Sequence, residues 1–416
     1  MSSPFGRPLA AALLGVAASI AAGANAEPAP PYAVLVHESA QSPRIAEADA
    51  DVRAAQGRAA QAGTRPNPTL ELQVENLAGG RSAQLIAPVQ STLSASQTLE
   101  LGGKRQARVA AGRASVEAAR AQQRQAVAEF GYQLALAYVA AESAQARVKF
   151  LEQDLERVGE DLRAAKALVE AGREAELRSV QTQAAVSAVR ADLEAARASA
   201  IEALGKLSAL VGAPSPYTAV GPSLLARAAD LALPAGEPPA TTPAVLAAEA
   251  ERDAAAQRVN VERARSTPDV TFSLGARRVE GLGSTLVVGG ASVPLPLFDR
   301  NRGAVSAARA EQDAAEARLR TARLDAEAVW RSGQARAAAS RAALSAAMEG
   351  ETAAGEAYRL SRIGYEAGRT PLIELLAARR ALTEAQTRGL DARAQRIQSE
   401  AALARLSGRI PFGETP

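Results

Sequence analysis

The chain contains two copies of one structural unit, and this duplication constrains its fold more than any other feature. Glu170-Ala171-Gly172-Arg173 recurs 196 residues later as Glu366-Ala367-Gly368-Arg369, and Leu210-Val211-Gly212 recurs at the same distance as Leu406-Ser407-Gly408. Upstream the offset is slightly larger, since Pro66 matches Pro268. A period of about 200 residues is too long for a solenoid of stacked repeats and indicates a duplicated domain.

The duplication predicts how the chain is organised. Residues 27–212 form the first copy and residues 243–416 the second. Residues 213–242, between the copies, are rich in proline and glycine, which predicts a linker. Residues 1–26 have the pattern of a secretory signal peptide, in which Arg7 precedes a short apolar run and Ala24-Asn25-Ala26 is the cleavage site.

Each copy carries two segments in which polar and apolar residues alternate. Residues 69–75 place Leu70, Leu72 and Val74 on one face of a strand, and residues 90–101 repeat the alternation. Residues 270–274 and 287–297 do the same in the second copy. Period-2 alternation over about 8 to 10 residues is typical of membrane β-barrel strands. An amphipathic hairpin on a soluble sheet is the alternative.

Very long helices follow the strands in each copy. Residues 103–169 contain no proline, and their apolar residues from Val148 to Val169 are spaced alternately three and four apart, as in a coiled coil. Gly172 and Gly368 then predict helix ends, because glycine suits the position after a helix. Each copy is therefore predicted to form a long antiparallel helical hairpin.

Four strands cannot close a barrel, since eight is the usual minimum. The apolar strand faces must then be covered by lipid or by another chain, and three chains with four strands each would give an allowed barrel of twelve strands. The predicted fold is thus mainly helical with a small β part. In a homotrimer it would form a 12-stranded β-barrel continuous with an α-helical barrel.

Composition excludes several classes of function. The chain has no cysteine and a single histidine, His37, so it offers no thiolate or histidine metal cluster and no catalytic triad. We therefore expect no enzyme activity, no cofactor and no resident metal site. A net charge of +3 over 416 residues is too small for a nucleic-acid-binding surface. No segment after residue 26 is long and apolar enough for a transmembrane helix.

The chain resembles the TolC-type outer membrane efflux proteins over nearly all of its length after residue 26. The resemblance rests on the duplication, on Arg65-Pro66-Asn67-Pro68, on the Ala-Gly-Arg turns and on the Leu-x-Gly endings. The segments 97–105 (QTLELGGKR) and 294–303 (PLPLFDRNRG) resemble the heavy-metal branch, typified by cobalt–zinc–cadmium efflux channels.

This resemblance implies a location, partners and a substrate. The trimer would sit in the outer membrane, in contact with its lipid, and extend into the periplasm. There it would receive heavy-metal cations from an inner-membrane RND-type pump and a periplasmic adaptor, or membrane fusion protein. The alternatives are a channel for drug efflux or type I protein secretion, a structural periplasmic coiled-coil protein or adaptor, and an enzyme.

The resemblance also implies site residues at the helical turns. Adaptors of the family dock at the positions of Gly172, Arg173, Gly368 and Arg369. Family members close the periplasmic end with a tyrosine and an arginine, followed by acidic rings. Tyr365 matches the tyrosine, Thr370 stands at the arginine position beside Arg369, Glu374 matches the first acidic ring, and Ala377 stands at the second.

Three glutamates on the polar faces of the strands are candidates for the lumen of the barrel. They are Glu71, Glu75 and Glu100. In a lumen they would give a weak preference for cations. Ordinary solvated glutamates would have the same pattern, because an exposed charge reveals little by itself.

Overall fold

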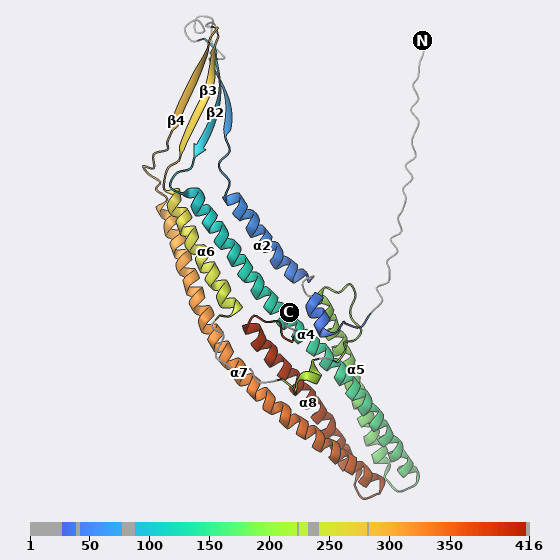
Figure 1. The fold of residues 1–416 in the computed structure, drawn as a ribbon. Coiled ribbons are helices and arrows are strands. Elements are labelled where there is room, and N and C mark those ends of the chain that lie inside the picture. The colour runs from blue at the N-terminus through green and yellow to red at the C-terminus, as the bar shows by residue number, and fades with distance from the viewer. Residues whose placement is uncertain are drawn as a thin grey trace, which may run out of the picture.

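The computed structural model describes residues 27–38, 42–76, 88–222, 224–231, 241–280 and 283–412, so the predicted signal peptide lies outside the described residues. In chain order the elements are α1 (Tyr32–Glu38), α2 (Pro43–Ala62), β1 (Thr69–Glu75), β2 (Gln90–Leu99), α4 (Lys104–Glu170), α5 (Glu176–Val211), η2 (Leu225–Arg227), α6 (Pro243–Arg265), β3 (Val270–Val279), β4 (Thr285–Ser292), α7 (Arg302–Glu366) and α8 (Leu372–Leu406). The molecule is elongated, with the sheet at one end and the turns of both helical hairpins at the other (Figure 1). The predicted mainly helical fold is confirmed.

The strands form one antiparallel sheet in the order β1-β2-β3-β4. Thr69 pairs with Ser96 in the first hairpin, and Thr271 pairs with Ser292 in the second. This register puts the leucines of β1 on the same face as Leu93, Leu274 and Val287. That face is open: Leu70 is 75% exposed and Val287 is 80% exposed. The sheet of one chain therefore has an uncovered apolar face and two edge strands, β1 and β4.

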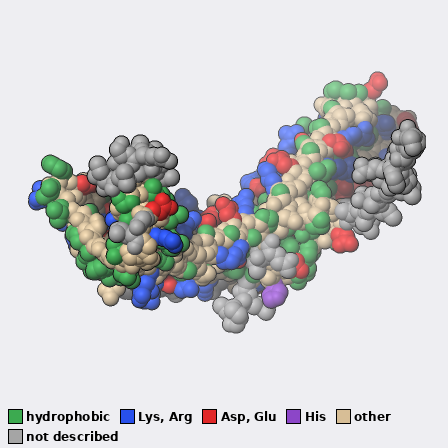
Figure 2. All heavy atoms as spheres, turned by 90° about the horizontal axis from the view of Figure 1, so that it is seen from above, with side chains coloured by type: hydrophobic (Ala, Val, Ile, Leu, Met, Phe, Trp, Pro, Cys, Tyr) green, Lys and Arg blue, Asp and Glu red, His purple; other side chains and the backbone are tan. Residues whose placement is uncertain are grey.

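The helices continue from the sheet as a curved layer. α4 has 67 residues and α7 has 65, each about 100 Å long at 1.5 Å per residue. α4 packs against α5 through successive apolar layers, one around Leu151 and Leu193 and the next around Val158 and Val189. The alternating three- and four-residue spacing keeps this seam continuous along the helices. Basic and acidic side chains lie scattered among hydrophobic ones on the face of the molecule seen in Figure 2.

The largest core lies where the middle of α4 meets α1, α5 and α8. Leu134, Tyr138, Leu207 and Ile397 are buried here. The described part of the predicted linker, residues 213–222 and 224–231, contributes buried Leu224 and Leu225 and contains the 3-10 turn η2. The Tyr138 hydroxyl donates to the Gly221 carbonyl at 2.9 Å. The linker thus packs against the middle of the long helices.

In the described part of the chain, none of the helices combines the length and the apolar character that crossing a membrane requires.

Candidate functional site at the helical turns

The two hairpin turns have the same backbone geometry. Gly172 and Gly368 have φ angles of +67° and +70°, a region that other residues rarely adopt. The Arg173 amide donates to the Leu168 carbonyl at 2.9 Å, and the Arg369 amide donates to the Gly364 carbonyl at 2.8 Å. These bonds complete the usual glycine-terminated helix end. A Cβ atom at either glycine would meet nothing within 4 Å, so both turns face open space.

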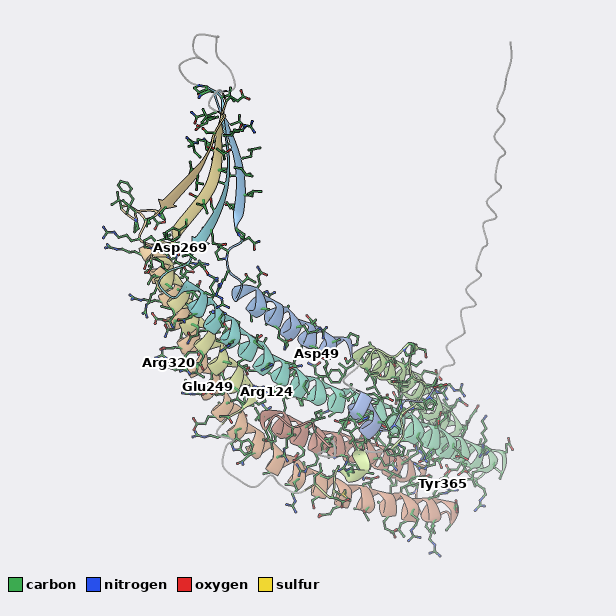
Figure 3. The ribbon with its side chains drawn as sticks, turned by 45° about the horizontal axis from the view of Figure 1, so that its top comes forward. Asp49, Arg124, Glu249, Asp269, Arg320 and Tyr365 are labelled. Atoms are coloured by element: carbon green, nitrogen blue, oxygen red, sulfur yellow. The ribbon has the colours of Figure 1, made fainter. Side chains whose placement is uncertain are left out.

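The residues predicted around the second turn occupy different environments. Arg369 and Glu374 are exposed, and Glu374 lies in the first turn of α8. The Thr370 side chain lies against the backbone of Gly364, where a Cβ atom would be only 2.1 Å from the Thr370 hydroxyl. Tyr365 is buried with Tyr358, Leu372 and Leu375, far from the sheet (Figure 3). Burial raises the pKa of the Tyr365 hydroxyl, and Glu174 raises it further.

A buried ion pair that the sequence reasoning missed joins the two hairpins near these turns. Arg379 of α8 donates to Asp154 of α4 at 2.8 Å, and the two side chains are 8% and 3% exposed. Asp161 lies two turns further along α4 and is 6% exposed. Burial raises its pKa to about 6, although Arg379 and Arg362 act in the opposite direction. This group of charges lies where α4, α7 and α8 converge.

The same place holds most of the unpaired buried polar atoms of the described residues. Six of the eight atoms of this kind belong to it: Asp154 Oδ1, Arg157 Nη1, Asp161 Oδ2, Tyr358 Oη, Tyr365 Oη and Arg379 Nε. An unpaired buried polar group costs about 1–3 kcal/mol. The contact between the hairpins is therefore weaker here than its buried area alone would suggest.

Four ion pairs within the described residues connect α4 to the second hairpin along its length. Glu129 pairs with Arg405 at 2.7 Å and Arg147 with Asp391 at 3.0 Å. Closer to the turns, Asp154 pairs with Arg379 and Glu160 pairs with Arg362 at 3.1 Å. Only the Asp154–Arg379 pair is buried, so we expect it to contribute most to holding the hairpins together.

A signal in the sequence could have revealed Asp154 and Asp161. With Val148 and Leu151 as a and d positions of the heptad, both aspartates occupy g positions, seven residues apart. Charged g residues commonly pair with a neighbouring helix. The partner, Arg379, follows 225 residues after Asp154, and the helix pattern alone does not connect the two.

The predicted lumen glutamates lie at the other end of the molecule. Glu71 and Glu75 are on the polar face of β1, and Glu75 accepts a hydrogen bond from Gln73 at 3.0 Å. Glu100 follows β2 and pairs with Arg108 at the start of α4. Arg277 is on the same polar face, where it donates to Thr92 at 3.0 Å. The face thus carries a cation as well as carboxylates.

An exposed apolar sheet that continues into two long helical hairpins, with matching turns at the far end, defines a membrane-anchored channel component. The chain belongs to the outer membrane efflux protein family, whose model matches residues 34–213 and 240–409. This is a family of channels and not of enzymes. The predicted membership and the outer membrane location are confirmed.

Individual relatives extend this assignment. The chain is 44% identical to the nickel-cobalt-cadmium resistance protein NccC of Alcaligenes xylosoxydans xylosoxydans, over 94% of this chain and 89% of NccC. It is 45% identical to the nickel and cobalt resistance protein CnrC of Cupriavidus metallidurans, over 94% of this chain and 93% of CnrC. In fold it matches the open state of the MtrE outer membrane channel of Neisseria gonorrhoeae, with a TM-score of 0.77, 21% identity, and coverage of 93% and 91% of the two chains.

Proposed function

We propose that three copies of this chain form a passive conduit that carries heavy-metal cations from a periplasmic adaptor and an inner-membrane RND-type pump to the cell exterior. The observation that carries the proposal is the open four-stranded sheet with its exposed apolar face. Three such sheets would close a 12-stranded barrel in the lipid of the outer membrane. The conduit itself would carry out no chemistry, and the choice of metal would belong to the pump.

The two close relatives support the substrate class, since their names specify resistance to nickel, cobalt and, for NccC, cadmium. Metal cations would pass through without dedicated soft ligands, because the chain has no cysteine and one histidine.

The assembly is tested by fractionation of cells followed by electrophoresis with and without heating. We expect a heat-sensitive three-chain species in the outer membrane fraction. A folded monomer that is soluble in water without detergent would contradict the proposal, because its apolar sheet face would have no cover.

We further propose that the exposed turns contact the adaptor through Arg173 and Arg369. An aspartate at Gly172 or Gly368 would lie beside the arginine and neutralise it. Asparagine has nearly the same shape and tolerates the same backbone conformation, so it is the matched control. We expect crosslinking to the adaptor to fall strongly in Gly172→Asp and Gly368→Asp and much less in Gly172→Asn and Gly368→Asn. Equal crosslinking in all four variants would refute the contact.

Glu374 is proposed to form a ring of three carboxylates at the narrow periplasmic end. Glu176 is its control, since it is also exposed and also lies in the first turn of a returning helix. We expect Glu374→Gln to lower the cation-to-anion permeability ratio by about twofold or more, because like charges around one axis attract cations. Glu176→Gln should leave it unchanged. The measurement is the reversal potential in a salt gradient across a planar bilayer, and an unchanged value in Glu374→Gln would show that no such ring exists.

We propose that the contact of α4 with α7 and α8 is the part of the conduit that loosens when the periplasmic end opens. Its buried pair holds the hairpins together, while its unpaired polar atoms make separation less costly.

A further inference from the structure

The junction between strand and helix in the first copy packs tightly against the segment that precedes β3. The Leu101 amide donates to Asp269 Oδ1 at 3.1 Å, and Lys104 pairs with Asp269 Oδ2 at 2.8 Å. A Cβ atom at Gly102 would lie 2.5 Å from the Thr267 hydroxyl, so only glycine fits there. Figure 3 shows Asp269 at the base of the sheet. This internal seam joins β2 and α4 of the first copy to residues 266–269 of the second.

The sheet register fixes how the two copies correspond at this seam. The pairs Thr69–Ser96 and Thr271–Ser292 are equivalent, so β1 maps onto β3 with an offset of 202 and β2 maps onto β4 with an offset of 196. Leu101, Gly102 and Lys104 therefore correspond to Leu297, Phe298 and Arg300. Thr267 and Asp269 correspond to Arg65 and Asn67.

The second junction is uncovered in a single chain. Residues 291–300 are all exposed, with Leu295 at 73% and Phe298 at 98%. Its covering segment would be residues 64–67, but these precede β1, at the opposite edge of the sheet from β4. Within one chain the two segments cannot meet.

We propose that Phe298 of one copy packs against residues 64–67 of the next copy and that this contact holds neighbouring protomers together. The proposal rests on the three-chain assembly proposed above. A head-to-tail contact of this kind closes into a ring when the rotation permits. The proposed contact follows the pattern of the internal seam, because that seam joins the equivalent segments of the two copies within one chain.

The edge that would receive Phe298 has the shape and chemistry to take an aromatic ring. A hollow of about 770 Å³ there is lined by Arg58, Gln61, Ala62, Thr64, Arg65, Pro66, Asn67 and Arg108. Arg58 and Arg65 are exposed, and a guanidinium group packs favourably on an aromatic face. The Leu297 amide donates to the Leu295 carbonyl of its own chain at 2.8 Å, whereas its counterpart Leu101 donates to Asp269, so the contact between copies rests on the Phe298 ring and not on an equivalent amide bond. Arg300 would face the side-chain amide of Asn67, whereas its counterpart Lys104 pairs with the carboxylate of Asp269.

The two seams therefore differ in their physical basis. The internal seam has an ion pair and a glycine, whereas the seam between copies has an aromatic ring in a hollow and no equivalent ion pair. The contact between copies should accordingly depend little on salt.

The chain has no cysteine, so paired cysteines test the contact directly. In outer membranes that carry Phe298→Cys with Arg65→Cys, we expect oxidation to give covalent dimers and trimers on denaturing gels. Phe298→Cys with Thr267→Cys is the matched control, and it should give no linked copies because both positions border one hollow of the same chain. A second pair, Leu297→Cys with Asn67→Cys, keeps Phe298 and Arg65 and should also link the copies.

Unheated electrophoresis of the same samples distinguishes the three-chain assembly from the specific contact of Phe298. If the three-chain assembly forms but neither cysteine pair links its copies, Phe298 does not contact residues 64–67 of the next copy, and its side chain lies in the lipid instead. The proposed function would still stand. If the unmodified protein forms no assembly at all, the proposed function fails and this inference fails with it.

Discussion

Replacing Arg379 with methionine is expected to loosen the second helical hairpin from α4 by about 3–5 kcal/mol, since it leaves the Asp154 carboxylate buried without its partner. The expected results are faster amide hydrogen exchange in α8 and a higher conductance of the closed channel in planar bilayers. Removing both charges, as in Asp154→Leu with Arg379→Met, should restore values near those of the unmodified protein, because no unpaired charge is then buried.

Arg147→Met is the matched control for this experiment. Its pair with Asp391 also joins α4 to α8, but the two side chains are 43% and 63% exposed. An exposed pair of this kind contributes no more than about 1 kcal/mol. If Arg379→Met loosens α8 no more than Arg147→Met does, the buried pair does not hold the hairpins together.

The stability of the contact between α4 and the second hairpin is expected to depend on pH through Asp161. Burial raises its pKa from 3.8 to about 6, so the packed contact of α4 with α7 and α8 favours the protonated carboxyl. The stability that protonation provides is fully present below about pH 4 and is lost as the pH rises through about 6. A shift of about two pKa units corresponds to up to about 3 kcal/mol. The charged and titratable groups that interact with it are Asp154 and Glu160 of α4, Tyr358, Arg362 and Tyr365 of α7, and Arg379 of α8.

We therefore expect the closed channel to conduct less at pH 5 than at pH 7.5. Asp161→Asn, which stays neutral at both values, should remove the difference and hold the contact closed at pH 7.5. Asp391→Asn, which alters an exposed carboxylate on the same seam, should retain the difference. A pH dependence that survives in Asp161→Asn would assign it to another group.

The sequence predicted the parts of this fold that follow from local pattern. Period-2 alternation placed β1 to β3 and most of β4, and the spacing of apolar residues placed α4, because both patterns reflect which face of an element is buried. The alternation was wrong in extending the last strand to residue 297, since β4 ends at Ser292. The duplication made each prediction in one copy a check on the other.

What the sequence did not predict depends on contacts between distant segments. The Asp154–Arg379 pair joins helices whose relative rotation is set by packing and not by their own pattern. The packed role of residues 213–222 and 224–231 was also missed, since proline and glycine predict a turn-rich segment whether or not it is buried. The exposure of Phe298 could be interpreted only from the sheet register, which makes Gly102 its counterpart. Gly102 contacts Thr267, so the register indicates which segment should contact Phe298.

The role of this chain as the outer membrane conduit is tested most directly by the rate at which cells release accumulated nickel or cobalt in the presence of the matching pump and adaptor. With this chain deleted, we expect the metal to stay in the cells, and with the chain restored we expect release into the medium to resume. Release that is equally fast with and without the chain would contradict its role as the outer membrane conduit.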